Sequence, residues 1–512
     1  MMQSLPHTIL QHILSSLDNL DRLCFTLTCK LWFEQRDRYL VLHTSDTFLF
    51  SAYYYANSPL FKFNSYRMAL CRSLEKHGGL FDQEVSNQPM DTPIYAYVNY
   101  LYFSNTFNYP LPKLWIPGSI TTLRFGFSFN HPLLEDTLPF GLRTLAFGNS
   151  FNQRIIPGTL PTSLRKLAFG NDFNKPLEFG AIPNGVETIS FGNCYDEPLV
   201  AGTLPSSTKH LCFGNNFDQD VLPSVLPKSI VSLKFGYYFN RSLSGGVLPP
   251  QLKSLRVDRG FKKELMQKDL PESITKLRYV YHKNSLSLPK CTTNLVIDEV
   301  NDPLEPGTVP PSVTKLEFSH DYNHGIEVGV IPPSVTSLKV GIVLAQKLKP
   351  NMIPMTVTSI DMGLLYNRQL EPGLLPKSVT TLRLGSTFRH RLDPKLLPRL
   401  TRLEVPSHYK HPIPNTVTSL RLHNGVYYNF SQDQFDLEAL PSTTTVALDI
   451  PTLERINIRL MDDRYSIFLS DHYFVGGFFS NQSMNDGSFL QQPKNTLTNN
   501  VVAASQENIP DE

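Results

Sequence analysis

The apolar residues of this chain recur at an interval of 22 residues. Nine consecutive units carry a leucine or isoleucine at the same position with no insertion or deletion between them, at Leu101, Leu123, Leu145, Leu167, Ile189, Leu211, Leu233, Leu255 and Leu277. The register continues with small insertions and deletions through Leu295, Leu316, Leu338, Ile360, Leu382, Leu403 and Leu420, which makes sixteen units. A fixed period of this length is typical of repeat architectures, in which each unit buries its apolar face against its neighbours.

Each clear unit predicts one short strand followed by a turn. Leu167 and Phe169 are two residues apart, so both side chains of a strand would point into the core. Gly170 ends that strand, and Phe173 returns the chain to the interior. Proline is abundant, with 40 in 512 residues, and marks the bends, where a missing backbone donor is tolerated.

A polar residue follows the second phenylalanine of each unit. Asn152, Asn174 and Asn240 occupy this position, and Asp196 and Asp218 replace the asparagine twice. Side-chain amides stacked at this position can satisfy buried backbone groups of neighbouring turns. The sequence therefore predicts a polar ladder beside the apolar core.

The units resemble FNIP repeats, 22-residue units related to leucine-rich repeats and named for a Phe-Asn-x-Pro core. The literal motif occurs at Phe107–Pro110, Phe129–Pro132 and Phe173–Pro176. The resemblance implies a mainly β, leucine-rich-repeat-like solenoid with a small α-helical segment at its N-terminal end. Val340 and Met362 replace the first phenylalanine of their units, so irregular turns are expected there.

Residues 4–40 follow a helical pattern instead. Ile9 and Ile13 recur at helical spacing after Pro6, and Asp18-Asn19 supplies a break before a second apolar stripe. A segment of about 40 residues is too short to bury a core of its own, so its apolar faces need a partner or the neighbouring segment. One interpretation is a helical cap on the solenoid.

The same segment resembles an F-box, through Leu5-Pro6 at its start and Cys29-Lys30 before Trp32 at its end. By this resemblance it would bind a Skp-type adaptor and, through the adaptor, a cullin-based ubiquitin ligase. A helical cap and a degenerate relic of the motif are the alternatives. The residues expected to face the adaptor are Leu5, Pro6, Ile9, Ile13, Leu17 and Leu23.

The sequence pattern divides the chain into five segments. Residues 456–479 alternate between polar and apolar, which predicts a hairpin with Asp462-Asp463 and Gly476-Gly477 at its turns. The expected segments are an F-box-like helical segment at 1–40, a linker and N-terminal cap at 41–99, a solenoid of about 16 turns at 100–423, a C-terminal cap at 424–480 and a disordered tail at 481–512.

The chain carries no nucleophile elbow, phosphate loop, dinucleotide fingerprint or metal-ligand cluster, so neither catalysis nor a cofactor is expected. The close histidine pairs His320/His324 and His408/His411 are expected to be solvated. Six cysteines without a CxxC pair argue against a disulfide framework or zinc site, and no basic leader or long apolar run occurs. A net charge of +2 argues against binding to nucleic acid or membranes. The expectation is a cytoplasmic, protein-binding chain.

The two columns of residues that flank each inward leucine are basic. They contain 11 basic and 3 acidic residues in 32 positions, a charge of +8, so the rest of the +2 chain carries −6. Solvation of exposed strands by long cationic side chains is one interpretation. The other is binding of an acidic or phosphorylated protein segment. The residues expected to bind this target are Arg124, Lys166, Lys234, Arg256, Lys276 and Arg278.

These patterns together predict a substrate-recognition subunit of a cullin-based ubiquitin ligase. The F-box-like segment would bind the adaptor, and the basic face of the strands would bind the target. The alternative is a cytosolic repeat scaffold for protein binding with no role in ubiquitin transfer.

Overall fold

The computed structural model describes most of residues 98–423 and shorter parts on either side of them. Two compact units are distinguished: a larger one of residues 82–366 and 371–379, and a smaller one of residues 1–81, 367–370 and 380–512. The described residues are 10, 14, 17, 19–26, 34–36, 39–40, 49–51, 80–86, 94, 98–263, 265, 267–280, 288–298, 303–319, 326–341, 348, 350–406, 408–423, 445–450, 454–460, 465–470 and 476–480.

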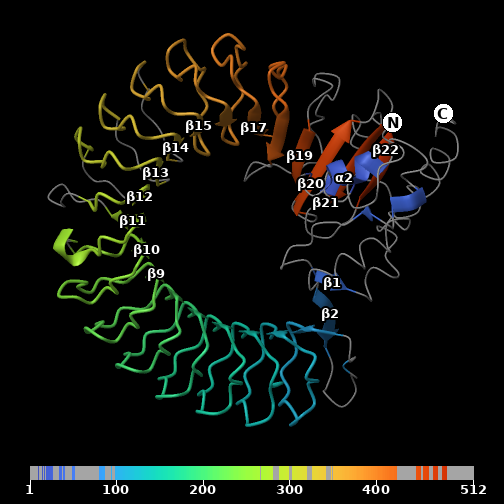
Figure 1. Cartoon of the computed structure of the whole chain (residues 1–512), viewed down its shortest axis with the longest axis vertical. Coiled ribbons are helices and arrows are strands. Elements are labelled where there is room, and N and C mark those ends of the chain that lie inside the picture. The colour runs from blue at the N-terminus through green and yellow to red at the C-terminus, as the bar shows by residue number, and fades with distance from the viewer. Residues whose placement is uncertain are drawn as a thin grey trace. The chain divides into compact units, whose positions relative to one another are not determined.

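The larger unit is built from short parallel strands, one in each repeat. Figure 1 shows strands β9 to β15 along one side of this array and the connecting turns along the other side. Strand β2 (Leu80–Val85) enters the larger unit at Asp82. The strands that follow it are β3 (Tyr100–Phe103), β4 (Thr122–Arg124), β5 (Thr144–Ala146), β6 (Lys166–Ala168), β7 (Thr188–Ser190), β8 (His210–Cys212), β9 (Ser232–Lys234), β10 (Ser254–Arg256), β11 (Lys276–Val280), β12 (Asn294–Asp298), β13 (Lys315–Phe318), β14 (Ser337–Lys339) and β15 (Ser359–Asp361). A 3-10 helix, η4 (Gln267–Asp269), precedes β11.

The strands pair in the register that the repeat predicts. Leu167 on β6 lies opposite Leu145 on β5 and Ile189 on β7. The register survives the shorter spacing at Leu295, which pairs with Leu277. In each strand the leucine or isoleucine is buried between more exposed neighbours, as at β6. The predicted mainly β solenoid is therefore confirmed.

Two columns of stacked aromatic rings fill the core behind the strands. Within one repeat the rings of Phe169 and Phe173 lie 4.1 Å apart, and Phe169 stacks on Phe191 of the next repeat at 5.4 Å and an interplanar angle of 5°. Parallel-displaced rings at these separations attract each other beyond the area that they bury. Val340 and Met362, which replace the first phenylalanine, are still buried. One repeat alone cannot bury these rings, so stacking of repeats creates the core.

The predicted polar ladder is present at the corner after the second aromatic column. The backbone N–H of Asn174 donates to Oδ1 of Asn152 at 3.0 Å, and Asn174 accepts in the same way from the N–H of Asp196. Asp196 and Asp218 continue the ladder, because Oδ1 of Asp196 accepts from the N–H of Asp218 at 2.9 Å. Every bond joins residues 22 apart, so one side chain per repeat satisfies a backbone donor of the next repeat.

The glycine two residues after each of strands β4 to β9 allows close approach of the backbones. A Cβ atom placed on Gly170 would lie 1.8 Å from the carbonyl oxygen of Gly148 in the preceding repeat. A side chain at this position is therefore excluded by the spacing of adjacent turns rather than by backbone dihedral angles.

The smaller unit combines parallel strands with an antiparallel meander. Strands β16 to β19 pair in parallel, and β19 to β22 pair antiparallel. Its elements are helix α2 (Asn19–Thr26) and strands β1 (Leu49–Ser51), β16 (Thr381–Arg383), β17 (Arg402–Pro406), β18 (Ser419–His423), β19 (Thr445–Ile450), β20 (Glu454–Leu460), β21 (Tyr465–Ser470) and β22 (Gly476–Ser480).

The predicted C-terminal hairpin corresponds to β20 and β21. The placement of Gly476 and Gly477 at a turn is wrong, because they begin β22 and lie opposite Leu469 and Phe468. Pairing with β21 compensates for the weak strand preference of glycine. Asp462-Asp463 and the expected tail at 481–512 lie outside the described residues.

Candidate functional site

The N-terminal segment is described in part. Helix α2 begins at Asn19, where the sequence predicts a break. Leu23 is fully buried and Leu17 is half-buried, and Nε of Arg22 donates to the carbonyl oxygen of Leu17 at 2.9 Å. Four of the residues expected to face an adaptor, Leu5, Pro6, Ile9 and Ile13, lie outside the described residues.

Four of the six residues expected to bind a target lie together on three adjacent strands. Lys234 on β9, Arg256 on β10 and Arg278 on β11 are successive cross-strand neighbours. Lys276 lies on β11 as well, on the other side of the buried Leu277. We call Lys234, Arg256, Lys276 and Arg278 the dense group.

Arg124 and Lys166 lie apart from that group. Arg124 on β4 is exposed and lies opposite Tyr102 and Ala146. Lys166 on β6 is also exposed, between Thr144 and Thr188. Neither residue has a charged cross-strand neighbour in its register, so the two are single cations on a polar surface.

Two aspartates neutralise the two arginines of the dense group. Nη2 of Arg256 lies 3.0 Å from Oδ1 of Asp258, and Nε of Arg278 lies 3.6 Å from the same oxygen. Arg278 also makes a two-pronged pair with Asp298, through Nε and through Nη2, which is 3.0 Å from Oδ1. Asp298 is completely buried. A buried carboxylate needs a charge partner, so Arg278 has a structural role.

Sequence reasoning missed both aspartates because neither one stands directly beside an inward leucine. Asp258 follows Arg256 by two residues, a spacing that puts both side chains on one side of a strand. Asp298 ends β12 opposite Val280. The two-residue spacing in the sequence was a signal for the Arg256–Asp258 pair. The Arg278–Asp298 pair depends instead on the extension of β11 and β12 to five residues each.

Other cations of the strand face are paired as well. Nζ of Lys339 lies 2.6 Å from Oε1 of Glu317 on the neighbouring strand. In the smaller unit, Oε1 of Glu404 on β17 lies 3.2 Å from Nε of Arg383 and 3.7 Å from Nε of Arg421. Two of the three acidic residues of the columns, Glu317 and Glu404, thus hold cations. Asp258 and Asp298 add carboxylates outside the columns, so the +8 charge of the columns overstates what a ligand would meet.

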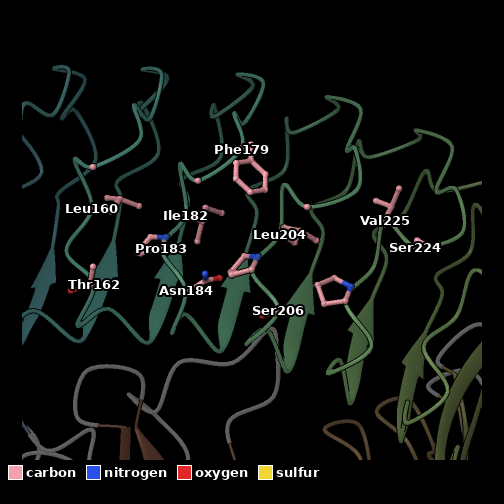
Figure 2. Close-up of a pocket in the computed structure, with 15 residues that line it drawn as sticks. Leu160, Thr162, Phe179, Ile182, Pro183, Asn184, Leu204, Ser206, Ser224 and Val225 are labelled. Atoms are coloured by element: carbon pink, nitrogen blue, oxygen red, sulfur yellow. The ribbon is translucent and has the colours of Figure 1, made fainter.

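A groove of about 660 Å³ runs along the turns that precede β6, β7, β8 and β9. Figure 2 shows Leu160, Ile182 and Leu204 of successive turns along it, with the ring of Phe179 above them. Phe179 is 80% exposed. The lining consists of apolar, glycine, proline and small polar residues and has no ionisable side chain, so it offers no general acid or base.

The described residues provide no group of three or more histidine, cysteine, aspartate or glutamate side chains that could hold a metal ion. Nε2 of His411, at the surface, donates to the carbonyl oxygen of Arg389 at 2.8 Å, whereas His320 and His324 lie outside the described residues. Cys24, Cys194, Cys212 and Cys291 are free thiols. Of the helices in the described part of the chain, none has the length and apolar character needed to span a membrane.

The repeats, each with one short parallel strand, define a repeat solenoid. This class of protein is typical of binding scaffolds without catalysis. Comparison with known families agrees with this class. The FNIP Repeat family matches residues 107–150, 151–194, 195–238, 239–278, 284–321, 322–365 and 366–408, and the F-box domain family matches residues 2–34. The chain belongs to the FNIP repeat family, and the predicted F-box resemblance is confirmed.

Two solved structures match parts of this chain. CroV588, described as a novel circular leucine-rich-repeat protein, has 31% sequence identity and a TM-score of 0.49, over 68% of this chain and 52% of that chain. The present chain thus spans about half the length of that structure. YopM from Yersinia enterocolitica WA-314 has 16% identity and a TM-score of 0.35, over 75% of this chain and 88% of that one. A comparison with curated protein sequences gave no match.

Proposed function

We propose that this chain is the substrate-recognition subunit of a cullin-based ubiquitin ligase in the cytoplasm. The observation that carries the proposal is the presence of an F-box at residues 2–34 and seven FNIP matches between residues 107 and 408 in one chain. The F-box would bind a Skp-type adaptor, and the solenoid would bind a protein target. Holding both partners raises the effective concentration of the target near the ubiquitin-carrying enzyme.

The target-binding part of the proposal rests on the strand face of the solenoid. The solvent-facing side of the short parallel strands presents one residue on each side of every buried leucine, so a long partner can contact many repeats at once. Exposed cations such as Lys166 and Lys276 favour an acidic or phosphorylated partner. No bond chemistry is assigned to the chain itself.

Co-purification of the full chain with a Skp-type adaptor tests the proposal. A variant carrying Leu5→Ala, Pro6→Ala and Ile13→Asp should lose a stoichiometric complex that the wild type forms. A Lys276→Glu, Lys315→Glu variant is the matched control, because it changes the solenoid and should keep the adaptor. A folded wild-type protein that captures no adaptor would overturn the proposal.

A second candidate function is a protein-binding scaffold with no ubiquitin role, in which the N-terminal helices only cap the chain. The burial of Leu10, Leu14 and Leu23 within the chain itself favours this alternative, because buried leucines are not available to a partner. The same co-purification separates the two functions, since only the receptor needs the adaptor.

A further inference from the structure

The cations on the strand face of the larger unit fall into two groups. Arg256, Arg278 and Lys339 are held by carboxylates of the chain. The second group consists of residues that form no ion pair within the described part of the chain, and we call these the unpaired cations. They are Arg124, Lys166, Lys234, Lys276 and Lys315.

The place where guanidinium groups converge is already occupied. The carboxylate of Asp258 lies between Arg256 and Arg278, and Asp298 takes the remaining donors of Arg278. Recognition of a single phosphate needs several donors that converge on one group. A phosphate at this point would have to displace Asp298, which is fully buried and would then lose its charge partner. The geometry therefore disfavours recognition of one phosphoryl group.

Three of the unpaired cations, Lys234, Lys276 and Lys315, are instead spaced two strands apart, on β9, β11 and β13. Lys276 on β11 and Lys315 on β13 occupy the same column, with Asn294 of β12 between them. Adjacent strands lie about 4.8 Å apart, so two strands separate these lysines by about 10 Å. A peptide in the extended polyproline II conformation has about three residues per turn and rises about 3.1 Å per residue, so every third side chain lies on the same side of the peptide, about 9 Å apart, which matches the separation of successive lysines.

Lys234 is the third unpaired cation in this part of the strand face. It lies on β9, two strands from β11, in the column that follows the buried leucines, whereas Lys276 and Lys315 lie in the column that precedes them. Lys276 and Lys315 are exposed, and Lys234 is half-buried. A partner with several well-spaced negative charges matches this pattern better than a partner with one dense charge, because each lysine can then meet its own carboxylate.

We propose that the strand face of β9 to β13 binds an extended, unphosphorylated acidic segment with a carboxylate at about every third residue, through Lys234, Lys276 and Lys315. This inference rests on the proposed function, since it specifies the target that the receptor would hold. Arg256 and Arg278 stabilise the strand face through their ion pairs and do not contact the ligand.

Fluorescence anisotropy with the full chain and three labelled synthetic peptides tests the inference. The first peptide has three glutamates separated by pairs of glycine and serine, the second has the same composition with the glutamates adjacent, and the third has one phosphoserine and no glutamate. We expect the spaced peptide to bind about tenfold more tightly than either of the others, and its affinity to fall as salt rises.

Two charge-matched variants give the control. Lys276→Glu with Lys315→Glu should weaken binding of the spaced peptide about tenfold, because two attractive contacts become repulsive. Lys228→Glu with Lys377→Glu changes the net charge equally on exposed turn residues and should leave the affinity within about twofold. Circular dichroism of both variants checks that they are folded.

The outcomes separate this inference from the proposed function. Equal binding of the spaced and clustered peptides, tighter binding of the phosphoserine peptide, or an equal loss in both variants would overturn it. Adaptor capture by the same wild-type preparation reports on the receptor role independently. Capture without spaced-peptide preference would refute the inference alone, whereas peptide binding without capture would refute the receptor role alone.

Discussion

At the scale of single residues, the spacing of the turns after β4 to β9 depends on glycines, because a Cβ atom there would meet the backbone of the preceding turn. Gly170→Ala would place a Cβ atom 1.8 Å from a backbone oxygen, and a backbone neighbour cannot rotate away. We expect the free energy of unfolding to fall by about 2–3 kcal/mol in urea denaturation, as for overpacked cores. Gly245→Ala is the control, because its φ of +77° causes strain but open space surrounds it. It should cost about 1 kcal/mol, and an equal cost at both sites would contradict the close-approach argument.

A single buried tyrosine should make stability depend on alkaline pH. Burial raises the pKa of Tyr409 to about 12, and its hydroxyl accepts from the N–H of Leu392 at 3.2 Å. A raised folded-state pKa means that the stabilisation is complete below about pH 10 and is lost as the pH rises toward about 12. Urea denaturation across this interval should show a steeper loss for the wild type than for Tyr409→Phe. Parallel curves would show that other groups control alkaline unfolding.

At the scale of repeating elements, the polar ladder requires an acceptor in every repeat but not a particular residue. Asn174→Ala would leave the N–H of Asp196 without its acceptor, and we expect a loss of about 1–2 kcal/mol in urea denaturation. Asn174→Asp should be close to neutral, because Asp196 and Asp218 already accept from the N–H groups that follow them at 2.9 Å. A large loss for the aspartate variant would show that the amide donor also matters.

The Arg278–Asp298 pair joins strands β11 and β12 through a buried charge. Arg278→Ala should destabilise the protein by about 3–5 kcal/mol, because Asp298 would remain buried without a partner. Adding Asp298→Asn removes that charge and should recover part of the loss. A double-mutant cycle in urea measures the coupling, and independent, additive effects of the two substitutions would contradict a direct pair.

The repeat could be predicted from the sequence because its apolar residues recur at a fixed interval. A leucine every 22 residues determines the strand and its register, and Leu277 and Leu295 stay paired even where the spacing changes. The ion pairs could not be predicted in the same way, because Asp298 belongs to no periodic column. Counting charges along the columns predicted the basic face. It did not predict the ion pairs that neutralise part of this face, because those depend on contacts between neighbouring repeats.

At the scale of the whole molecule, the adaptor-binding and target-binding residues belong to different units. The F-box match covers residues 2–34, whereas Lys276 and Lys315 belong to the larger unit. Substitutions at sites that share no residues and belong to different units are expected to act additively, so each site should be removable without the other.

This separation leads to a prediction for the full chain. Ile13→Asp should abolish adaptor co-purification and leave the anisotropy of the spaced acidic peptide within about twofold of the wild type. Lys276→Glu with Lys315→Glu should do the reverse, because charge reversal on exposed strands removes attraction without disturbing the buried leucines beside them. If Ile13→Asp also weakened peptide binding, the N-terminal helices would be part of the fold of the solenoid. The chain would then be a capped scaffold, with a target-binding face that depends on its cap.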